Sequence, residues 1–276
     1  MYQIISKKIL AQDIIEYTIF APDVASRANP GQFVILRTEP DGERLPFTIC
    51  DFDRRAGTVV MLVQTVGAST YILSQKENGS YISDFLGPLG NATDLLMYNK
   101  ILLVSGGIGI AVTYPQAKLL HEHSKSFEMI IGARNYDLLI YKEEVKRITD
   151  SVHFTTDDGS FGFKGFVTDK VRELLSNENS KFDIIFAVGP LPMMRAVFNV
   201  AREFSVNTII SMNSIMLDGT GMCGCCRLTV NGKIKYACVD GPEFDANGID
   251  WNETINRSKR FKEIEAEHYC KVRGLC

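Results

Sequence analysis

The chain has 276 residues, a formal net charge of −3 at pH 7 and 23% charged residues. This length exceeds that of one typical domain, so we expect two or three. The weak negative charge and the absence of a basic block argue against a nucleic-acid or anionic-membrane partner. The N-terminus has no uninterrupted apolar region of the secretory-signal kind. No apolar run reaches the roughly 18 residues of a transmembrane helix.

Residues 1–97 are rich in short strand-like runs, which Gly, Pro, Asp and Asn residues separate. Turn signals stand at 28–31, at Asp41-Gly42 and at Gly79. Short strands at regular spacing predict an antiparallel β-barrel. One stretch with a helical pattern, 69–76, interrupts the strands.

At about residue 98 the pattern changes, and apolar strands alternate with helical stretches as far as residue 212. This alternation predicts βαβ units and a doubly wound parallel sheet, because strands covered by helices on both faces are apolar throughout. The expected strands are 101–107, 127–135, 152–159, 183–190 and 207–212. The expected helices are 110–123, 138–149, 166–178 and 192–204.

Residues 213–276 form a third, small region that begins with a Cys-rich loop. A hairpin around Asn231-Gly232 follows, a dipeptide typical of tight turns, and the tail from Trp251 onward has the pattern of a closing helix. The loop and hairpin carry the pattern Asp-x4-Cys-x2-Cys-x11-Cys. Its members are Asp218, Cys223, Cys226 and Cys238.

Plant-type [2Fe–2S] ferredoxins use Cys-x4-Cys-x2-Cys and a distant fourth Cys. The chain keeps this spacing and has a carboxylate, Asp218, in place of the first thiolate. We therefore predict that the four residues bind a two-iron cluster. The alternatives are a structural zinc site on the cysteines and a plain turn at Asp218.

The cysteines are odd in number, seven in all, and six of them crowd into the last quarter of the chain. Such crowding is a poor disulfide framework and, in a cytosolic protein, indicates metal binding. We therefore expect a cytoplasmic protein. Cys225 is an additional thiol that does not keep the x4 spacing, and Cys270 and Cys276 are expected to be free thiols or to face a partner.

Two turns in the 98–212 region predict a nucleotide site. The first follows a strand and opens a helix, where small residues let the backbone approach a pyrophosphate. The second ends a later strand, and ligands of open α/β sheets bind beyond the carboxyl ends of strands. The predicted NAD contacts in the two turns are Gly106, Gly107, Ile108, Gly109, Gly189 and Pro190. A Gly-rich turn that binds nothing is the alternative.

The residues after the second and third strands bear on the choice between NAD and NADP. Arg134 can bind a phosphate or remain a surface charge, whereas Asp157 would repel a 2′-phosphate if it faces the ribose. We expect NAD(H).

Two segments of the 1–97 region predict a flavin site. In the first, Arg44 can pair with a pyrophosphate, Pro46 and Phe47 can pack near the ring, and Thr48 can hydrogen-bond its edge. In the second, a short helix begins at a small-residue turn that offers a phosphate seat. Its residues are Gly67, Ala68, Ser69 and Thr70. A solvated Arg44, and N-capping by Ser69 or Thr70, are the alternatives.

The order of these motifs resembles the ferredoxin–NADP⁺ reductase superfamily. The motifs are R-x-P-F-T, V-G-x-S-T, G-G-I-G-I-A, G-P-x-P-M and then the cysteines. The resemblance covers nearly the whole chain and is closer to the branch with a C-terminal [2Fe–2S] module. It implies an FAD-binding β-barrel at 1–97, an NAD(H)-binding domain at 98–212 and a cluster module at 213–276. It departs from the family pattern at Val188, where a Cys is usual, and at Val112, where a Pro is usual.

That branch contains two kinds of oxidoreductase subunit. One is the electron-transfer subunit of type B dihydroorotate dehydrogenase, which the family pattern gives four cysteines. The other is the small subunit of the electron-bifurcating NADH-dependent reduced ferredoxin:NADP⁺ oxidoreductase, with an aspartate and three cysteines. Asp218 favours the second. The resemblance implies electron transfer between NAD(H), FAD and the cluster, and a heterodimer with a larger flavoprotein or iron–sulfur subunit.

Two other classes remain open at this point. One is a stand-alone NAD(P)H-flavin reductase or sensor with zinc in place of the cluster. The other is an interaction subunit without catalytic activity.

Overall fold

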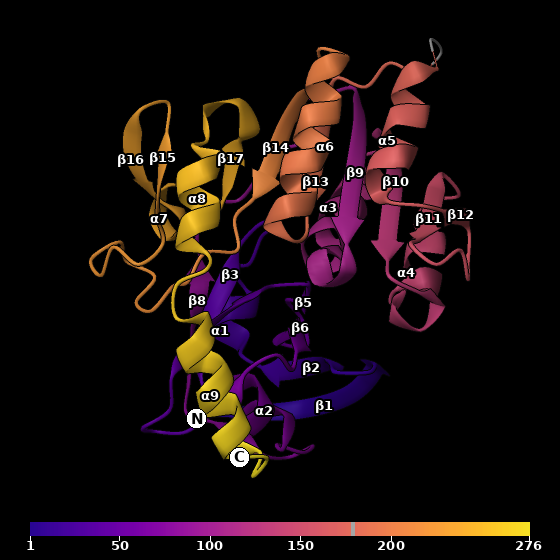
Figure 1. The fold of residues 1–276 in the computed structure, drawn as a ribbon. Coiled ribbons are helices and arrows are strands. Elements are labelled where there is room, and N and C mark those ends of the chain that lie inside the picture. The colour runs from indigo at the N-terminus through magenta and orange to yellow at the C-terminus, as the bar shows by residue number, and fades with distance from the viewer. Residues whose placement is uncertain (178–179) are drawn as a thin grey trace.

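The computed structural model describes residues 1–177 and 180–276. Its first part forms two antiparallel sheets, ordered β5-β6-β2-β1-β7 and β4-β3-β8 (Figure 1). The strands are β1 Tyr2–Ala11, β2 Ile14–Phe20, β3 Phe33–Arg37, β4 Arg44–Thr48, β5 Asp51–Asp53, β6 Thr58–Gln64, β7 Tyr81–Ile82 and β8 Asp84–Leu89. The helices are α1 Pro22–Ala25 and α2 Ala68–Ser74.

Strand β3 has a buried side chain at each of its first four positions because both of its faces are covered. Val34 and Leu36 lie in the core between the two antiparallel sheets. Phe33 and Ile35 point the other way, since side chains alternate along a strand, and they lie in a second core. The sheet β4-β3-β8 is therefore a wall between the N-terminal part and the rest of the molecule.

The middle part is a parallel sheet that one antiparallel strand extends, in the order β12-β11-β10-β9-β13-β14-β17. The expected doubly wound architecture is confirmed. Its strands are β9 Lys100–Gly106, β10 Ser126–Ala133, β11 Val152–Thr156, β12 Phe163–Lys164, β13 Ile184–Val188 and β14 Asn207–Ser211. Its helices are η1 Gly107–Gly109, α3 Ile110–Glu122, η2 Tyr136–Leu138, α4 Lys142–Lys146, α5 Val167–Ser176 and α6 Leu191–Glu203.

Each face of this sheet has its own core, which explains the uniformly apolar strands. Leu102 and Val104 of β9 pack on the face that α5 and α6 cover. Ile101 and Leu103 pack on the opposite face with residues of α3.

The expected helix 138–149 is wrong in extent, because only Lys142–Lys146 is α-helical. Tyr141 has a left-handed backbone with φ of 59°, which stops a helix from continuing through it. Leu139 and Ile140, which precede Tyr141, are buried. They therefore pack in the core although they are not helical. The last residue of the expected helix 166–178 lies outside the described residues.

The C-terminal part does not stand apart from the sheet. Strand β17 pairs antiparallel with β14, Ile210 opposite Phe244, and so forms the sheet edge. The predicted division at 212/213 thus falls where the chain leaves the sheet and before it returns. The elements are β15 Arg227–Val230, β16 Lys233–Tyr236, α7 Ala237–Asp240, β17 Glu243–Asp245, η3 Ala246–Gly248, α8 Trp251–Arg257 and α9 Lys262–Val272.

The tail forms two helices where one was expected. Phe261, with φ of 65°, separates α8 from α9. Helix α9 runs back to the N-terminal part (Figure 1), and the rings of Tyr269 and Tyr71 lie 6.1 Å apart on α9 and α2. The expectation of free thiols at Cys270 and Cys276 is wrong, because the structure joins them in a disulfide. The turn after α9 brings their Cα atoms to 5.6 Å.

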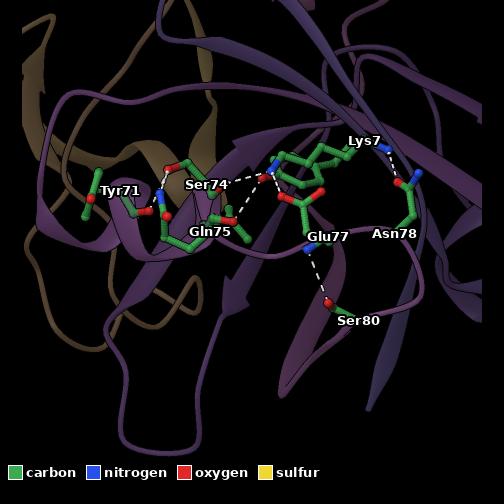
Figure 2. A network of polar contacts seen from close by, with 9 residues as sticks. Lys7, Tyr71, Ser74, Gln75, Glu77, Asn78 and Ser80 are labelled. Carbon is green, nitrogen blue, oxygen red and sulfur yellow. Dashed lines mark hydrogen bonds and ion pairs between the residues drawn. The ribbon is translucent and has the colours of Figure 1, made fainter.

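The end of α2 is fixed to strand β1 by a polar network (Figure 2). Lys7 Nζ donates to the backbone oxygen of Ser74 at 2.9 Å and pairs with Glu77 at 2.6 Å. The Lys7 backbone N–H donates to Asn78 at 2.7 Å. Behind it, the buried Tyr17 hydroxyl donates to the Leu73 backbone oxygen at 2.9 Å. Helix α2 is thus held in place independently of anything that binds at its first turn.

None of the described helices has the length and apolar character needed to cross a membrane.

The turn after β9 yields a stability prediction. A methyl group at Gly109 would lie 2.3 Å from the Val188 backbone oxygen, which cannot move aside. Gly109→Ala should therefore lower the free energy of unfolding by about 3 kcal/mol in a urea titration. Gly107→Ala is the matched control, since its φ of +56° is strained but no atom lies within 4 Å. That control should lose about 1 kcal/mol. Equal losses would contradict the close approach.

Candidate functional site

The two glycine-rich turns lie against each other at the carboxyl edge of the parallel sheet. Strands β9 and β13 are neighbours, with Val188 opposite Ser105. A methyl group at Gly106 would lie 2.3 Å from Met193 Sδ and 3.5 Å from Pro190 Cδ. The structure therefore brings together the predicted NAD contacts of both turns. Gly107, which faces open space, leaves its backbone accessible to a ligand.

Arg134 and Asp157 lie further along the same edge. The backbone N–H of Asp157 donates to the backbone oxygen of Ala133 at 3.1 Å. The backbone N–H of Asp158 donates to the backbone oxygen of Arg134 at 3.3 Å. Both Arg134 and Asp157 are exposed. These backbone contacts make the two residues neighbours, beyond the ends of β10 and β11.

The two predicted flavin segments also come together. The Ser69 hydroxyl, in the first turn of α2, donates to Glu43, which directly precedes Arg44. Thr70 caps the helix: its hydroxyl oxygen accepts from the Gly67 N–H at 3.0 Å and donates to the Gly67 oxygen at 2.9 Å. The capping alternative thus holds for Thr70 itself.

The exposed Arg44 forms no ion pair with any residue in the described ranges. Its guanidinium is available for a phosphate. Pro46 and Phe47 are half-buried on β4, which is the edge strand of its sheet. Thr48 pairs with Phe33 of β3. The residue that is predicted to contact the flavin edge therefore lies directly beside β3.

The predicted metal ligands fall into two pairs. Cys226 and Cys238 are buried, and their Sγ atoms lie 3.3 Å apart. The Asp218 carboxylate instead accepts the backbone N–H of Thr220 at 2.9 Å and of Cys223 at 2.8 Å. These donors lower the pKa of Asp218 below its usual value, the Thr220 N–H most. Asp218 thus organises the loop that presents the exposed Cys223.

Within 1–177 and 180–276, no three His, Cys, Asp or Glu side chains are gathered as a preformed metal site. The donor set nevertheless fits an iron–sulfur cluster. Burial, followed by the hydrogen bond with Cys226, raises the pKa of Cys238 to about 12. Thiols in such a place become thiolates only against a metal cation. Two sulfurs bound to one tetrahedral metal at about 2.3 Å would lie roughly 3.8 Å apart, near the separation seen here.

The Cys-rich loop packs on the sheet β4-β3-β8, which carries the predicted flavin contacts. A methyl group at Gly219 would lie 2.7 Å from Leu89 Cδ1 of β8 and 3.0 Å from Ile35 Cδ1 of β3. Cys226 and Cys238 share a hydrophobic core with Phe33 and Ile35. The strand that carries the predicted flavin edge and the loop that carries the cysteines are therefore separated by little more than β3.

A junction between the three parts centres on Glu243, the first residue of β17. Its Oε2 accepts from the Thr93 hydroxyl at 2.6 Å, and its Oε1 accepts from the Ser211 hydroxyl at 3.0 Å. Beside it, Asn91 donates its backbone N–H to Gly241 at 2.7 Å and its side-chain amide to Val239 at 3.1 Å. Residues 91–93 thus connect the N-terminal part to the cluster segment.

Burial raises the pKa of Glu243 to about 7. Sequence reasoning missed this residue, although it lies five positions after Cys238. An acid directly after Gly241-Pro242 and before an apolar residue was the available signal. Nothing in the sequence indicated that two hydroxyls from distant segments would enclose it.

Two family models match the chain. Residues 213–250 match the iron–sulfur cluster binding domain of dihydroorotate dehydrogenase B, and residues 103–199 match an oxidoreductase NAD-binding domain. Fold and site thus define an NAD-dependent oxidoreductase of the ferredoxin reductase type with a C-terminal iron–sulfur segment. The predicted cofactor set of FAD, NAD(H) and a [2Fe–2S] cluster is confirmed at this level.

Relatives match over most of the chain. The dihydroorotate dehydrogenase B electron transfer subunit homolog of Thermotoga maritima is 46% identical over 275 residues, 99% of this chain and 96% of that protein. The dihydroorotate dehydrogenase B electron transfer subunit of Fusobacterium nucleatum is 33% identical over 249 residues, 87% of this chain and 94% of that one. The chain belongs to this family of electron-transfer subunits and their homologues, which implies a partner subunit.

A solved structure is also similar. A chain of the NADH-dependent reduced ferredoxin–NADP oxidoreductase, studied for flavin-based electron bifurcation, superposes with a TM-score of 0.93. The two chains are 44% identical, and the match covers 99% of this chain and 98% of that one.

The carboxyl of Glu243 yields a second stability prediction. Its pKa rises from 4.5 to about 7 on folding, so the native state binds the extra proton between these values. Stability should therefore fall as pH rises through this window, by no more than about 3 kcal/mol.

Glu243→Gln removes the charge and should raise Tm relative to wild type at pH 8 but not at pH 5. Asp245→Asn, an exposed neighbour on the same strand, is the control and should show no such difference between the two pH values. The same effect of Glu243→Gln at both pH values would contradict a carboxyl that ionises near neutrality.

Proposed function

We propose that this chain is the small, electron-transfer subunit of an electron-bifurcating NADH-dependent ferredoxin:NADP⁺ oxidoreductase. The observation that carries the proposal is the carboxylate at Asp218 in place of a first cysteine, in a loop packed on the flavin-bearing wall. The similarity to the solved ferredoxin–NADP oxidoreductase chain, 44% identical over 99% of this chain, supports it. Electron transfer to a type B dihydroorotate dehydrogenase is the second candidate, which the identity to the Thermotoga homolog favours.

The carboxyl edge of the parallel sheet would hold NAD(H). Gly107 offers an open backbone and the N-terminus of α3 favours the pyrophosphate. Ile108 would complete the first turn, and Gly189 with Pro190 would line the other side. Asp157 would accept from the ribose hydroxyls, with Arg134 beside it, and a carboxylate there disfavours the 2′-phosphate of NADP.

The N-terminal part would hold FAD at strand β4 and the first turn of α2. Arg44 would pair with the pyrophosphate, Phe47 and Pro46 would pack near the ring, and Thr48 would donate or accept at its edge. The Ser69–Glu43 contact would keep the two phosphate-facing segments together. Gly67 and Ala68 would leave room for the phosphate, because nothing lies within 4 Å of a methyl group at Gly67.

Asp218, Cys223, Cys226 and Cys238 would hold the cluster. When bound, NAD(H) and FAD exchange a hydride, and the cluster exchanges one electron at a time. The protein's own residues bind and orient these groups and keep them apart by fixed distances. No side-chain acid or base is required for this chemistry. A larger flavoprotein or iron–sulfur subunit would exchange electrons with the cluster, in the cytoplasm and in a heterodimer with this chain.

Asp218→Cys tests the cluster ligands. The variant should still assemble a cluster, but with a changed visible spectrum and a lower potential, because a thiolate donates more charge to iron than a carboxylate. Asp245→Asn should leave both unchanged. An unaltered spectrum and potential in Asp218→Cys would mean that Asp218 only shapes the turn through Thr220 and Cys223.

The partner distinguishes the two candidate functions. Purification from native cells without oxygen should yield a complex that oxidises NADH and exchanges electrons with ferredoxin and NADP⁺. A complex that oxidises dihydroorotate would instead support the second candidate. A flavoprotein that contains zinc and no iron would support a stand-alone reductase, and a chain without stoichiometric FAD that NADH cannot bleach would support an inactive interaction subunit.

A further inference from the structure

The side chain of Glu243 lies where the three parts of the molecule meet. Gly31, in the turn before β3, approaches so closely that a methyl group there would lie 3.2 Å from Glu243 Oε2. Thr93 comes from the linker to the parallel sheet, and Ser211 ends β14. The carboxyl therefore touches the flavin-bearing part and the nucleotide sheet, and it belongs to the strand that follows the cluster segment.

Its partners suit both protonation states. A hydroxyl can donate to a carboxylate and can turn to accept from a carboxylic acid. Thr93 and Ser211 can therefore satisfy Glu243 with or without a proton, whereas an Arg or Lys partner would hold it ionised. Among the described residues, none of those lining its cavity is basic.

A route for protons exists beside it. Glu243 lines a cavity of about 360 Å³, which reaches solvent because the lining residues Asn91, Asp94 and Asp245 are exposed. The other ionisable groups facing it are those two acids and Tyr98; β14 and residues 29–32 contribute none. Asp240 of α7 is engaged with Lys235 at 2.8 Å.

Glu243 is also close to the cluster segment along the chain. It follows Cys238 by five residues, which limits the separation of their Cα atoms to roughly 18 Å. Asn91 binds the backbone oxygen of Val239, directly after Cys238, so cysteine and carboxyl share one scaffold. An added negative charge on the cluster would favour a proton on a carboxyl at this range.

We propose that Glu243 is a redox-linked proton acceptor: it takes one proton from solvent when the cluster gains one electron, and releases it when the electron leaves. The electron comes from reduced flavin or from the partner subunit, the proton enters through the cavity, and the net charge of the region is unchanged. This inference rests on the proposed function, because it requires a cluster at Cys238. The pKa near neutrality is consistent with it.

The test is an anaerobic redox titration of the cluster in the full chain with FAD bound, followed by electron paramagnetic resonance at pH 6, 7 and 8. The midpoint potential should fall as pH rises in wild type. Glu243→Gln should lose that shift, and Asp245→Asn, which alters an acid of the same cavity, should keep it. A redox-difference infrared spectrum should gain a protonated-carboxyl band on reduction, absent only in Glu243→Gln.

The proposal would be overturned if the midpoint potential of the wild-type cluster did not change with pH. It would also be overturned if the pH shift and the carboxyl band persisted in Glu243→Gln. Neither result would affect the assignment of the cluster. The wild-type measurements decide the matter even if Glu243→Gln fails to fold. A chain that assembles no cluster would overturn the proposed function, and this inference with it.

Discussion

The pairing of β17 with β14 is the contact on which the arrangement of the three parts depends. It joins the end of the loop and hairpin at 213–240 to the sheet. The chain returns to the sheet five residues after Cys238, with Phe244 opposite Ile210. The Asn91 and Thr93 contacts then fasten the same segment to the linker from the N-terminal part. A cysteine loop bound at both ends can hold a cluster at a defined place.

Strand β3 lies between the predicted flavin contacts and the cysteines and so brings them close together. Val34 and Leu36 face the N-terminal core, and Phe33 and Ile35 face the core that contains Cys226 and Cys238. Thr48, which is predicted to contact the flavin edge, lies opposite Phe33 of this strand. Electron transfer between protein-bound groups depends on fixed separation and orientation, which the fold supplies here through a single shared strand.

Much of this architecture could be predicted from the sequence, because its signals are local. The strand–turn–helix at Gly106–Gly109 and the Asn231-Gly232 hairpin each carry their own pattern. The prediction of a helix over 138–149 was wrong in extent. Apolar residues that the core buries, such as Leu139 and Ile140, gave the sequence a helix-like pattern, and nothing in the sequence signals the left-handed backbone of Tyr141. The edge strand Glu243–Asp245 is only three residues long and exists through its pairing.

The candidate site follows the same rule. The ligand spacing from Asp218 to Cys238 is readable in the sequence, as are the two turns at the sheet edge. The role of Asp218 in holding the N–H of Cys223, and the enclosure of Glu243 by Thr93 and Ser211, depend on contacts between distant segments. Such contacts arise from the tertiary fold, so no local sequence pattern predicts them.

The central claim is that one carboxylate and three thiolates of this chain bind two irons. The Mössbauer spectrum of anaerobically prepared, ⁵⁷Fe-enriched protein tests it most directly. The account predicts two ferric sites in equal amounts with distinct parameters, one of them shifted by an oxygen ligand. Two equivalent all-sulfur sites, or a protein that contains zinc and no iron, would contradict it.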